Sequence, residues 1–324
     1  MKPKVYVTRL IPEGPLTKLG ENCDYRLWDG ELAVPREVLL REVPPVDALL
    51  SLLTDKIDAA IMDAAPKLRV ISNMAVGFDN VDIREATRRK IMVCNTPEVL
   101  TDTAADFAFA LMLAAARRIV EGERLVRAGK WKTWGPMTLL GQDVHHATLG
   151  IIGLGRIGAE VAKRAKGFDM KILYYDTRRR PDLEKKLHVE YVDLRTLLAA
   201  SDFVTVHIPL LPETRHLIGE EQFKMMKKTA ILVNTARGPS VDPKALYKAL
   251  RDKQIAYAAL DVTEPEPIPP DDPLLTLDNI VIAPHIASAS VATRTRMAMM
   301  AVDNLLAGVK GEKPQHIVNP EVLT

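Results

Sequence analysis

The chain has 324 residues, which is long enough for two domains. Its 44 Lys and Arg against 42 Asp and Glu give a net charge of +2, so binding of nucleic acid through bulk positive charge is not expected. The hydrophobic content of 47% excludes a mainly disordered chain, and no run of about 18 apolar residues predicts a transmembrane helix. Cys23 and Cys94 are too few for a disulfide framework, and the N-terminus lacks the apolar run of a signal peptide. We therefore expect a cytoplasmic α/β protein with no membrane or nucleic-acid partner.

The first hundred residues alternate short apolar segments with helix-like ones. Strands are predicted at Lys4–Thr8, Asp47–Leu53, Leu68–Ser72 and Ile91–Asn95, and helices at Pro35–Val43 and Val81–Arg89. Alternation of this kind is typical of a parallel sheet with helices on its faces.

The pattern changes near residue 100. Thr103 and Asp106 have the spacing of a capping box, which predicts that a long apolar helix begins there and covers Ala104–Val120. A polar connection, Gly129–His146, leads to a second α/β series. Its strands are predicted at Thr148–Ile152, Lys171–Tyr175, Phe203–Ile208, Ala230–Asn234, Ala258–Val262 and Asn279–Ala283. The fold class expected is therefore α/β, with two Rossmann-like or flavodoxin-like parallel-sheet domains and an active-site cleft between them.

A glycine-rich turn lies between the first strand of the second series and the helical pattern that follows. Gly153-Leu-Gly-Arg-Ile-Gly158 fits G-x-G-x-x-G, and Asp176 ends the next strand, 23 positions after Gly153. The first glycine allows a tight turn, the second lets the backbone approach a pyrophosphate, and the third lets helix and strand pack closely. The helix N-terminus adds N–H groups and the positive end of the helix dipole. The unit therefore predicts a dinucleotide site.

Asp176 bears on the choice of cofactor. A carboxylate there accepts hydrogen bonds from ribose hydroxyls and repels a 2′-phosphate, which favours NAD(H). Arg178, Arg179 and Arg180 follow at once and could hold a 2′-phosphate, although they could equally form a solvated loop. NADP(H) remains the alternative.

Polar residues follow three successive strands of the second series. Arg237 follows one strand, Asp261 with Glu264 and Glu266 follows the next, and His285 follows the third. Because ligands bind outside the carboxyl ends of parallel strands, we expect these side chains at one edge of the sheet. Arginine can hold a carboxylate, histidine can exchange a proton, and a carboxylate can orient the imidazole. This set suits reversible reduction of a 2-keto acid by hydride from the cofactor.

Other polar residues have weaker signals. His207 lies near the same edge and is either a packing residue or a neighbour of the cofactor. No His, Cys and Asp spacing suggests a metal site.

The C-terminal part returns to the first domain. Glu264–Pro273 holds five prolines and predicts a rigid loop, and Ser288–Gly308 is typical of a helix that ends at a glycine C-cap. We expect Pro314–Thr324 to cross back to the first domain. The expected domains are residues 1–99 plus 288–324 for substrate binding and residues 100–287 for the dinucleotide.

Four motifs resemble the D-isomer-specific 2-hydroxyacid dehydrogenase family over essentially the full length. They are GIIGLGRIG at Gly150–Gly158, LVNTARGPSVD at Leu232–Asp242, ALDVTEPEP at Ala259–Pro267 and APHIASAS at Ala283–Ser290. Further stretches, among them TPEVLTDTAADFAFALMLAAARR and NLLAGVKGE, are most similar to the glyoxylate reductase/hydroxypyruvate reductase branch.

The resemblance implies a role for each matching position. Arg237 would bind the substrate carboxylate, His285 would be the acid/base, and Glu266 rather than Glu264 would pair with it. Backbone N–H groups of Val76 and Gly77 would also bind the carboxylate. The implied cofactor contacts are Thr103, Gly153, Leu154, Gly155, Arg156, Ile157, Gly158, Asp176, Arg178, Pro209, Thr214, Thr235, Ala236, Asp261 near the nicotinamide carboxamide, and Ser288.

The resemblance also implies a homodimer, with Ala104–Val120 and the arm after it at the interface. Trp131 and Trp134 would pack there or reach the substrate pocket of the partner. Three alternatives remain open from the sequence. They are another activity of the family, such as D-lactate or phosphoglycerate oxidation, a dinucleotide-sensing binding protein, and a methyltransferase.

Overall fold

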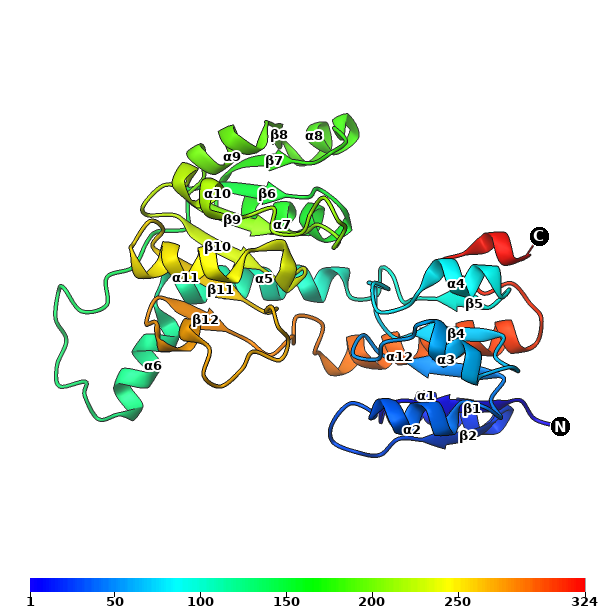
Figure 1. Cartoon of the computed structure of the whole chain (residues 1–324). Helices are drawn as coiled ribbons and strands as arrows, with labels where there is room; N and C mark the ends of the chain where they lie inside the picture. The colour runs from blue at the N-terminus through cyan, green and yellow to red at the C-terminus, as the bar shows by residue number, and fades with distance from the viewer. Residues whose placement is uncertain (324) are drawn as a thin grey trace. The chain divides into compact units, whose positions relative to one another are not determined.

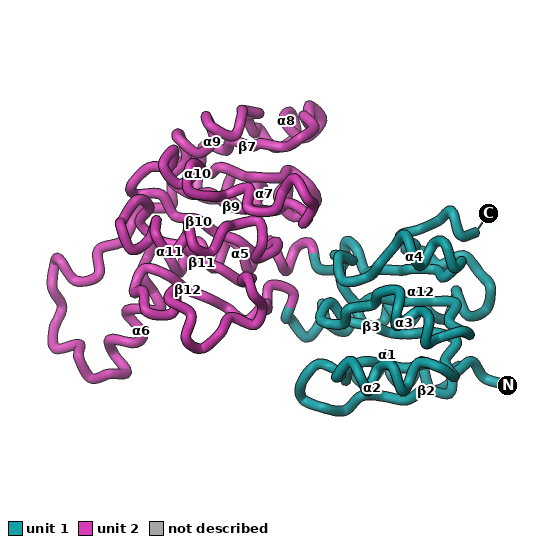
Figure 2. Tube along the Cα trace, viewed as in Figure 1, with its two compact units in different colours: residues 1–100, 289–324 teal, residues 101–288 magenta. Residues whose placement is uncertain are grey.

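The computed structural model describes residues 1–323 and divides into two compact units (Figure 2). Unit 1 comprises residues 1–100 and 289–324, and unit 2 comprises residues 101–288. Each unit is built on one sheet whose strands are all parallel, with helices on both faces (Figure 1). This confirms the predicted fold class of two parallel-sheet α/β units. Within the described residues, no helix has the length and apolar character needed to cross a membrane.

Unit 1 contains five strands in the order β2-β1-β3-β4-β5. Helices α1 and α12 cover one face over a core that includes Val70 and Val302, and α2, α3 and α4 cover the other. The strands are β1 (Lys4–Val7), β2 (Asp24–Leu27), β3 (Ala48–Ser51), β4 (Val70–Asn73) and β5 (Met92–Cys94), and the helices are α1 (Glu13–Asn22), α2 (Arg36–Glu42), α3 (Ala59–Ala64), α4 (Ile83–Arg88) and α12 (Val291–Val309).

Unit 2 contains seven strands in the order β12-β11-β10-β9-β6-β7-β8. Helices α5, α7 and α8 pack on one face, and α9, α10 and α11 pack on the other. The strands are β6 (Thr148–Ile152), β7 (Lys171–Tyr175), β8 (Glu190–Tyr191), β9 (Phe203–Val206), β10 (Ile231–Asn234), β11 (Tyr257–Leu260) and β12 (Ile280–Ile282). The helices are α5 (Thr101–Ala116), α6 (Ile119–Arg127), α7 (Arg156–Lys166), α8 (Pro181–Leu187), α9 (Leu194–Ala200), α10 (Glu220–Met225) and α11 (Pro243–Arg251).

The long apolar helix differs from the prediction at both ends. It begins at Thr101, so Thr103 lies inside its first turn and the predicted capping box is wrong. It ends at Ala116, because Arg118 adopts a left-handed φ of 52° and breaks the run that was expected to reach Val120. The chain then starts the separate helix α6.

The predicted glycine cap at Gly308 is also wrong. Helix α12 continues to Val309, and Lys310 is its C-cap. A Cβ on Gly308 would lie 2.6 Å from Cγ2 of Val70, so this glycine lets the helix pack closely on β4. Beyond α12, the chain remains with unit 1, where Val318 N donates to Val93 O at 2.7 Å.

Candidate active site

Three neighbouring strands bring the predicted side chains to one edge of unit 2. Strand β10 pairs with β11, and β11 pairs with β12, so the loops that follow them leave the sheet side by side. The first two loops are in direct contact, because a Cβ on Gly238 would lie 1.9 Å from Thr263 O. Only glycine permits this approach, which couples the loop of Arg237 to the loop of Glu266.

The imidazole of His285 contacts Glu266. His285 Nδ1 lies 2.5 Å from Glu266 Oε1, and Glu264 takes no part in this pair. The backbone of His285 has a φ of 55° and is held by a hydrogen bond from its N–H to Asp261 O at 2.9 Å. A carboxylate at Nδ1 orients the ring and leaves Nε2 for a substrate. The side chains of His285 and Glu266 are 24% and 35% exposed, so a ligand can reach them.

Asp261 holds the loop that carries His285. Its Oδ1 accepts from Ile286 N and its Oδ2 accepts from Ala287 N, both at 2.8 Å. Burial raises the pKa of Asp261, and these two N–H groups act in the opposite direction. The carboxyl group is thus a structural anchor for residues 285–287. Its expected position near the nicotinamide carboxamide stays a prediction.

Arg237 is partly buried and lies at the start of a short turn after β10. Asn234 closes this turn from both sides, because its Nδ2 donates to Arg237 O at 2.8 Å and its Oδ1 accepts from Ala236 N at 3.0 Å. A guanidinium presented by such a braced turn can bind a carboxylate through two N–H groups. Asn234 was not predicted as a site residue, although its place at the end of a strand was a usable signal.

The glycine turn has the geometry that a pyrophosphate site requires. Gly153 has a φ of 94°, and a Cβ on it would lie 2.7 Å from His207 O. A Cβ on Gly158 would lie 2.2 Å from Gly153 O, so the third glycine allows the start of α7 to pack on the turn. Gly155, by contrast, has no atom within 4 Å of its Cβ position. That open space lies at the N-cap of α7, whose first N–H groups receive no side-chain cap.

Two further observations fit a bound dinucleotide. Asp176 stands at the mouth of the turn, with Oδ2 accepting from Leu154 N at 2.9 Å. The hydroxyl of Thr235 is buried and has no hydrogen-bond partner in the described part of the chain. A buried hydroxyl without a partner is costly unless a ligand or water satisfies it. The residues present therefore fit a nicotinamide dinucleotide.

The remaining predicted cofactor contacts differ in how far their side chains are buried. Leu154 is fully buried and Ile157 packs against the same core, so they can offer only backbone or partly covered atoms, whereas Arg156 is exposed. Thr214 is 9% exposed, accepts from Leu211 N at 2.7 Å and donates to Pro209 O at 2.7 Å. The expected roles of these residues and of Ser288 stay predictions.

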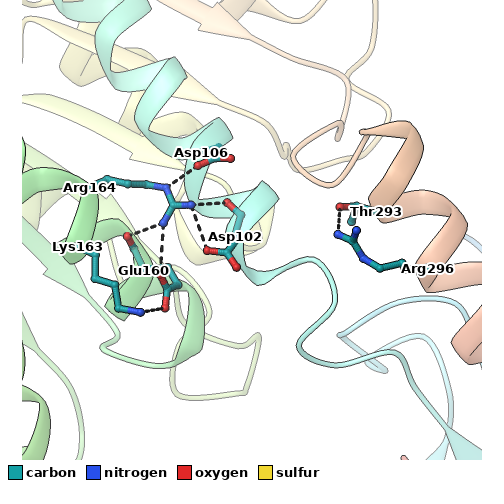
Figure 3. Close-up of polar contacts among 7 residues, drawn as sticks. All are labelled: Asp102, Asp106, Glu160, Lys163, Arg164, Thr293 and Arg296. Atoms are coloured by element: carbon teal, nitrogen blue, oxygen red, sulfur yellow. Dashed lines mark hydrogen bonds and ion pairs between the residues drawn. The ribbon is translucent and has the colours of Figure 1, made fainter.

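The start of α5, which carries Thr103, is fixed to the helix that follows the glycine turn. Arg164 of α7 contacts Asp106 at 2.6 Å and Asp102 at 3.2 Å, and it also contacts Glu160 (Figure 3). Burial lowers the pKa of Arg164, but its carboxylate partners outweigh that effect and the net shift is upward. These ion pairs hold Thr103 in a defined position relative to α7.

The ring of His207 belongs to the structural framework. Its Nε2 lies 2.8 Å from Thr205 Oγ1, and desolvation lowers the pKa of His207 to about 4. The ring is therefore neutral at pH 7 and unsuited to donate a proton. Among the described residues, no group of three His, Cys, Asp or Glu side chains could hold a metal ion.

Unit 1 presents a loop of unpaired backbone donors after β4. The carbonyls of Ala75, Val76 and Gly77 accept from Thr96 N at 2.8 Å, Asn95 Nδ2 at 2.8 Å and Asn73 Nδ2 at 3.0 Å. The C=O and N–H of a trans peptide point in opposite directions, so these bonds fix where the N–H groups of residues 76–78 point.

Those N–H groups donate no hydrogen bond within the described chain. Consecutive free N–H groups form a concavity that binds anions. Such a loop can bind a carboxylate, and the substrate contacts expected of Val76 and Gly77 stay predictions. Asn73 and Asn95, which brace it, were not predicted as site residues, although each stands at or directly after the end of a predicted strand.

Together, the glycine turn, the open helix N-terminus and the pair of His285 and Glu266 define a nicotinamide-dependent oxidoreductase. Residues 109–287 match the family model described as "D-isomer specific 2-hydroxyacid dehydrogenase, NAD binding domain". The chain belongs to the D-isomer-specific 2-hydroxyacid dehydrogenase family. This membership removes the methyltransferase alternative.

Individual relatives span the full length of the chain. The glyoxylate reductase of Korarchaeum cryptofilum is 60% identical over 100% of this chain and 98% of its own. A crystal structure of a protein from Thermus thermophilus is 46% identical, with a TM-score of 0.93 over 97% of this chain and 99% of its own. An NADPH-dependent glyoxylate/hydroxypyruvate reductase of Sinorhizobium meliloti, solved with NADP and malonate, is 32% identical, with a TM-score of 0.87 over 99% of this chain and 98% of its own.

Proposed function

We propose that this protein reduces glyoxylate or hydroxypyruvate to the 2-hydroxy acid with a reduced nicotinamide cofactor. The observation that carries the proposal is the 2.5 Å contact between His285 Nδ1 and Glu266 Oε1, at the sheet edge where Arg237 also lies. A binding protein that only senses a dinucleotide needs no such proton-transfer pair. The names of the relatives at 60% and 32% identity support the same substrates.

In this mechanism, unit 2 holds the dinucleotide and unit 1 supplies substrate-binding groups. Arg237 and the N–H groups of Val76 and Gly77 bind the keto-acid carboxylate, which fixes the orientation of the carbonyl group. The bound cofactor supplies the hydride. Protonated His285 donates from Nε2 to the carbonyl oxygen as negative charge develops there, and Glu266 keeps the ring oriented.

NAD(H) is the favoured cofactor of the two. Asp176 places a carboxylate beside the glycine turn, where it repels a 2′-phosphate. Two of the three arginines that follow are engaged: Arg179 pairs with Glu184 and Arg180 pairs with Asp182. Arg178 makes no ion pair in the described chain, so it is the residue through which NADP(H) could bind. NADP(H) stays the alternative.

A homodimer is the proposed assembly. The arm after α5 exposes large apolar side chains, and α6 has no buried residue. The exposed set is Ile119, Val126, Trp131, Trp134, Met137 and Leu140, with Trp134 at 78%. This many exposed apolar side chains on one arm favours a protein contact there.

A cavity of about 700 Å³ lies beside this arm, lined in part by Arg118, Leu140, Ile231 and Tyr257. Ile231 and Tyr257 begin β10 and β11, so the cavity opens at the opposite end of the strands from His285. It offers room for apolar groups from a second copy. Sedimentation of the purified chain and of a Trp134→Asp variant tests the dimer. Two related expectations stay predictions: that the tryptophans reach the partner's substrate pocket, and that the protein is cytoplasmic.

The function is tested with a panel of small 2-keto acids, each assayed with NADH and with NADPH. We expect oxidation of the cofactor to be fastest with glyoxylate or hydroxypyruvate and to favour NADH. Faster turnover of pyruvate would favour a D-lactate dehydrogenase, and oxidation of phosphoglycerate in a parallel assay with NAD⁺ as the hydride acceptor would favour that activity instead. No turnover with any acid would leave the dinucleotide-sensing alternative.

A further inference from the structure

We propose that Glu264 is a positioning residue. Glu264, Arg215 and His216 form a group that we call the clamp. The clamp holds the proline-rich loop, Glu264–Pro273, so that Glu266 stays against His285. The inference rests on the proposed keto-acid reduction, in which His285 donates the proton and Glu266 keeps its ring oriented.

The loop that carries Glu266 has little backbone anchoring of its own. Its five prolines provide no N–H group. In the described chain, every backbone hydrogen bond of residues 263–271 joins two residues of the segment 263–272. None of them connects the loop to another part of unit 2. One runs from Thr263 Oγ1 to Pro265 O at 2.7 Å, and another from Asp272 N to Pro269 O at 3.0 Å. The position of the loop must therefore come from side chains and packing.

The two glutamates of this loop bind in different places. Glu266 contacts His285, whereas Glu264 forms an ion pair with Arg215 and lies 2.7 Å, measured from Oε2, from His216 Nε2. Glu264 is the better covered of the two, with a side chain 21% exposed against 35%. Glu264 thus supplies the polar attachment of the loop and leaves Glu266 for the imidazole.

The other half of the clamp sits on a braced segment. Thr214 closes the turn before it through its bonds to Pro209 O and Leu211 N. His216 N donates to Pro239 O at 2.7 Å, and Ile218 N donates to Ser240 O at 3.1 Å. Residues 214–218 are therefore tied to the residues directly after Arg237.

The clamp consequently links the two loops of the site. It fixes the loop of Glu266 to the scaffold of Arg237, and the contact between Gly238 and Thr263 adds a second attachment next to Glu264. Asp242 is a further charged group beside the clamp, and its Oδ2 lies 3.9 Å from His216 Nδ1. Loss of the Glu264 charge would release Glu264 and Pro265 from the clamp. Glu266, the next residue, would then be held less firmly against His285.

The test compares Glu264→Gln with the matched control Glu213→Gln. Glu213 is exposed and has no hydrogen bond or ion pair in the described chain. For Glu264→Gln we expect kcat for glyoxylate to fall about tenfold, with KM for NADH unchanged. The pH at which the reduction rate falls to half should move down, because a protonated imidazole without its carboxylate partner releases its proton more easily. Glu213→Gln should match the unmodified protein.

A second variant guards against a folding defect. Arg215→Gln removes the other side of the clamp and should give the same loss and the same pH movement. The double variant should be no worse than either single one, because both changes break one unit. Unchanged kcat in both single variants would overturn the proposal. So would a lower kcat at an unmoved pH midpoint, since that result would mean a structural role only.

Failure of the proposed function would look different, because the unmodified chain would then reduce no keto acid. The clamp can still be judged in that case by an NMR titration of the His285 ring, which needs no substrate. The titration midpoint should move down in Glu264→Gln and not in Glu213→Gln. An identical midpoint in all three proteins would contradict the clamp.

Discussion

The two units offer different chemistry at the loops that follow their strands. In unit 1, the loop after β4 presents backbone N–H groups that are aimed by neutral partners, Asn73, Asn95 and Thr96. In unit 2, the loops after β10, β11 and β12 present the ionisable Arg237, Glu266 and His285.

The difference teaches how the two tasks of such an enzyme divide. Peptide dipoles are sufficient to bind an anion, and they do so at any pH. Proton transfer needs a group that titrates. We therefore expect changes in the unit 1 loop to alter keto-acid affinity at constant pH dependence, and changes at the titrating residues of unit 2, Glu266 and His285, to alter turnover and its pH dependence.

The largest effect is expected from His285→Ala. Removal of the proton donor should lower kcat for glyoxylate about 1,000-fold, because general acid catalysis contributes on that order. Binding of NADH should change little, since the glycine turn and Asp176 are untouched. Turnover is measured by the absorbance of the reduced nicotinamide, with NADH fluorescence as the binding control. A variant that reduces glyoxylate at the unmodified rate would remove His285 from the mechanism.

Arg237→Ala should have the second largest effect. Loss of the guanidinium should lower kcat/KM for glyoxylate about 100-fold, or about 3 kcal/mol, mainly through KM. Arg237→Lys keeps the charge without the two parallel N–H groups and should fall in between. Initial rates over a range of glyoxylate concentrations separate the two parameters. Equal KM values in all three proteins would show that the substrate carboxylate binds elsewhere.

The sequence predicted the architecture and the principal side chains because both follow from strand ends. Alternating apolar runs located the strands, and the residues after them included Arg237, Glu266 and His285. Short or exposed elements were missed: β2 has no fully buried residue, and β8 has only two residues, so neither has an apolar pattern.

The errors at helix ends have local causes that a pattern does not carry. The left-handed backbone of Arg118 ends α5 without a glycine, and Gly308 serves close packing on β4 instead of a cap. The brace of Asn95 on Val76 O and the clamp of Glu264 likewise join segments far apart in sequence. Such contacts have no period or spacing, so only the folded structure reveals them.

Asn95→Ala tests the unit 1 side of the comparison. Loss of the hydrogen bond to Val76 O removes about 1 kcal/mol of bracing, so KM for glyoxylate should rise about fivefold. The kcat and the pH profile should stay constant because no titrating group has changed. Asn22→Ala is a matched control, since Asn22 Nδ2 donates to Lys18 O at 2.9 Å elsewhere in unit 1. A changed pH profile in Asn95→Ala would break the proposed division of tasks.

The smallest effect is expected from Asp176→Ala, measured as the ratio of kcat/KM with NADPH to that with NADH. The ratio should rise about threefold, because a partly exposed charge contributes less than about 1 kcal/mol. Asp176 also accepts from Leu154 N, so a change in the ratio could come from the charge or from the shape of the turn. Asp176→Asn separates the two causes, because an amide oxygen can still accept from Leu154 N while carrying no charge. A rise of the same size in the Ala and Asn variants would assign the cofactor selectivity to the charge of Asp176. An unchanged ratio in both variants would show that Asp176 does not set the selectivity. If charge is the cause, a further Arg178→Ala change should lower the gain with NADPH, since the Arg178 guanidinium makes no ion pair with a neighbouring carboxylate in the described chain.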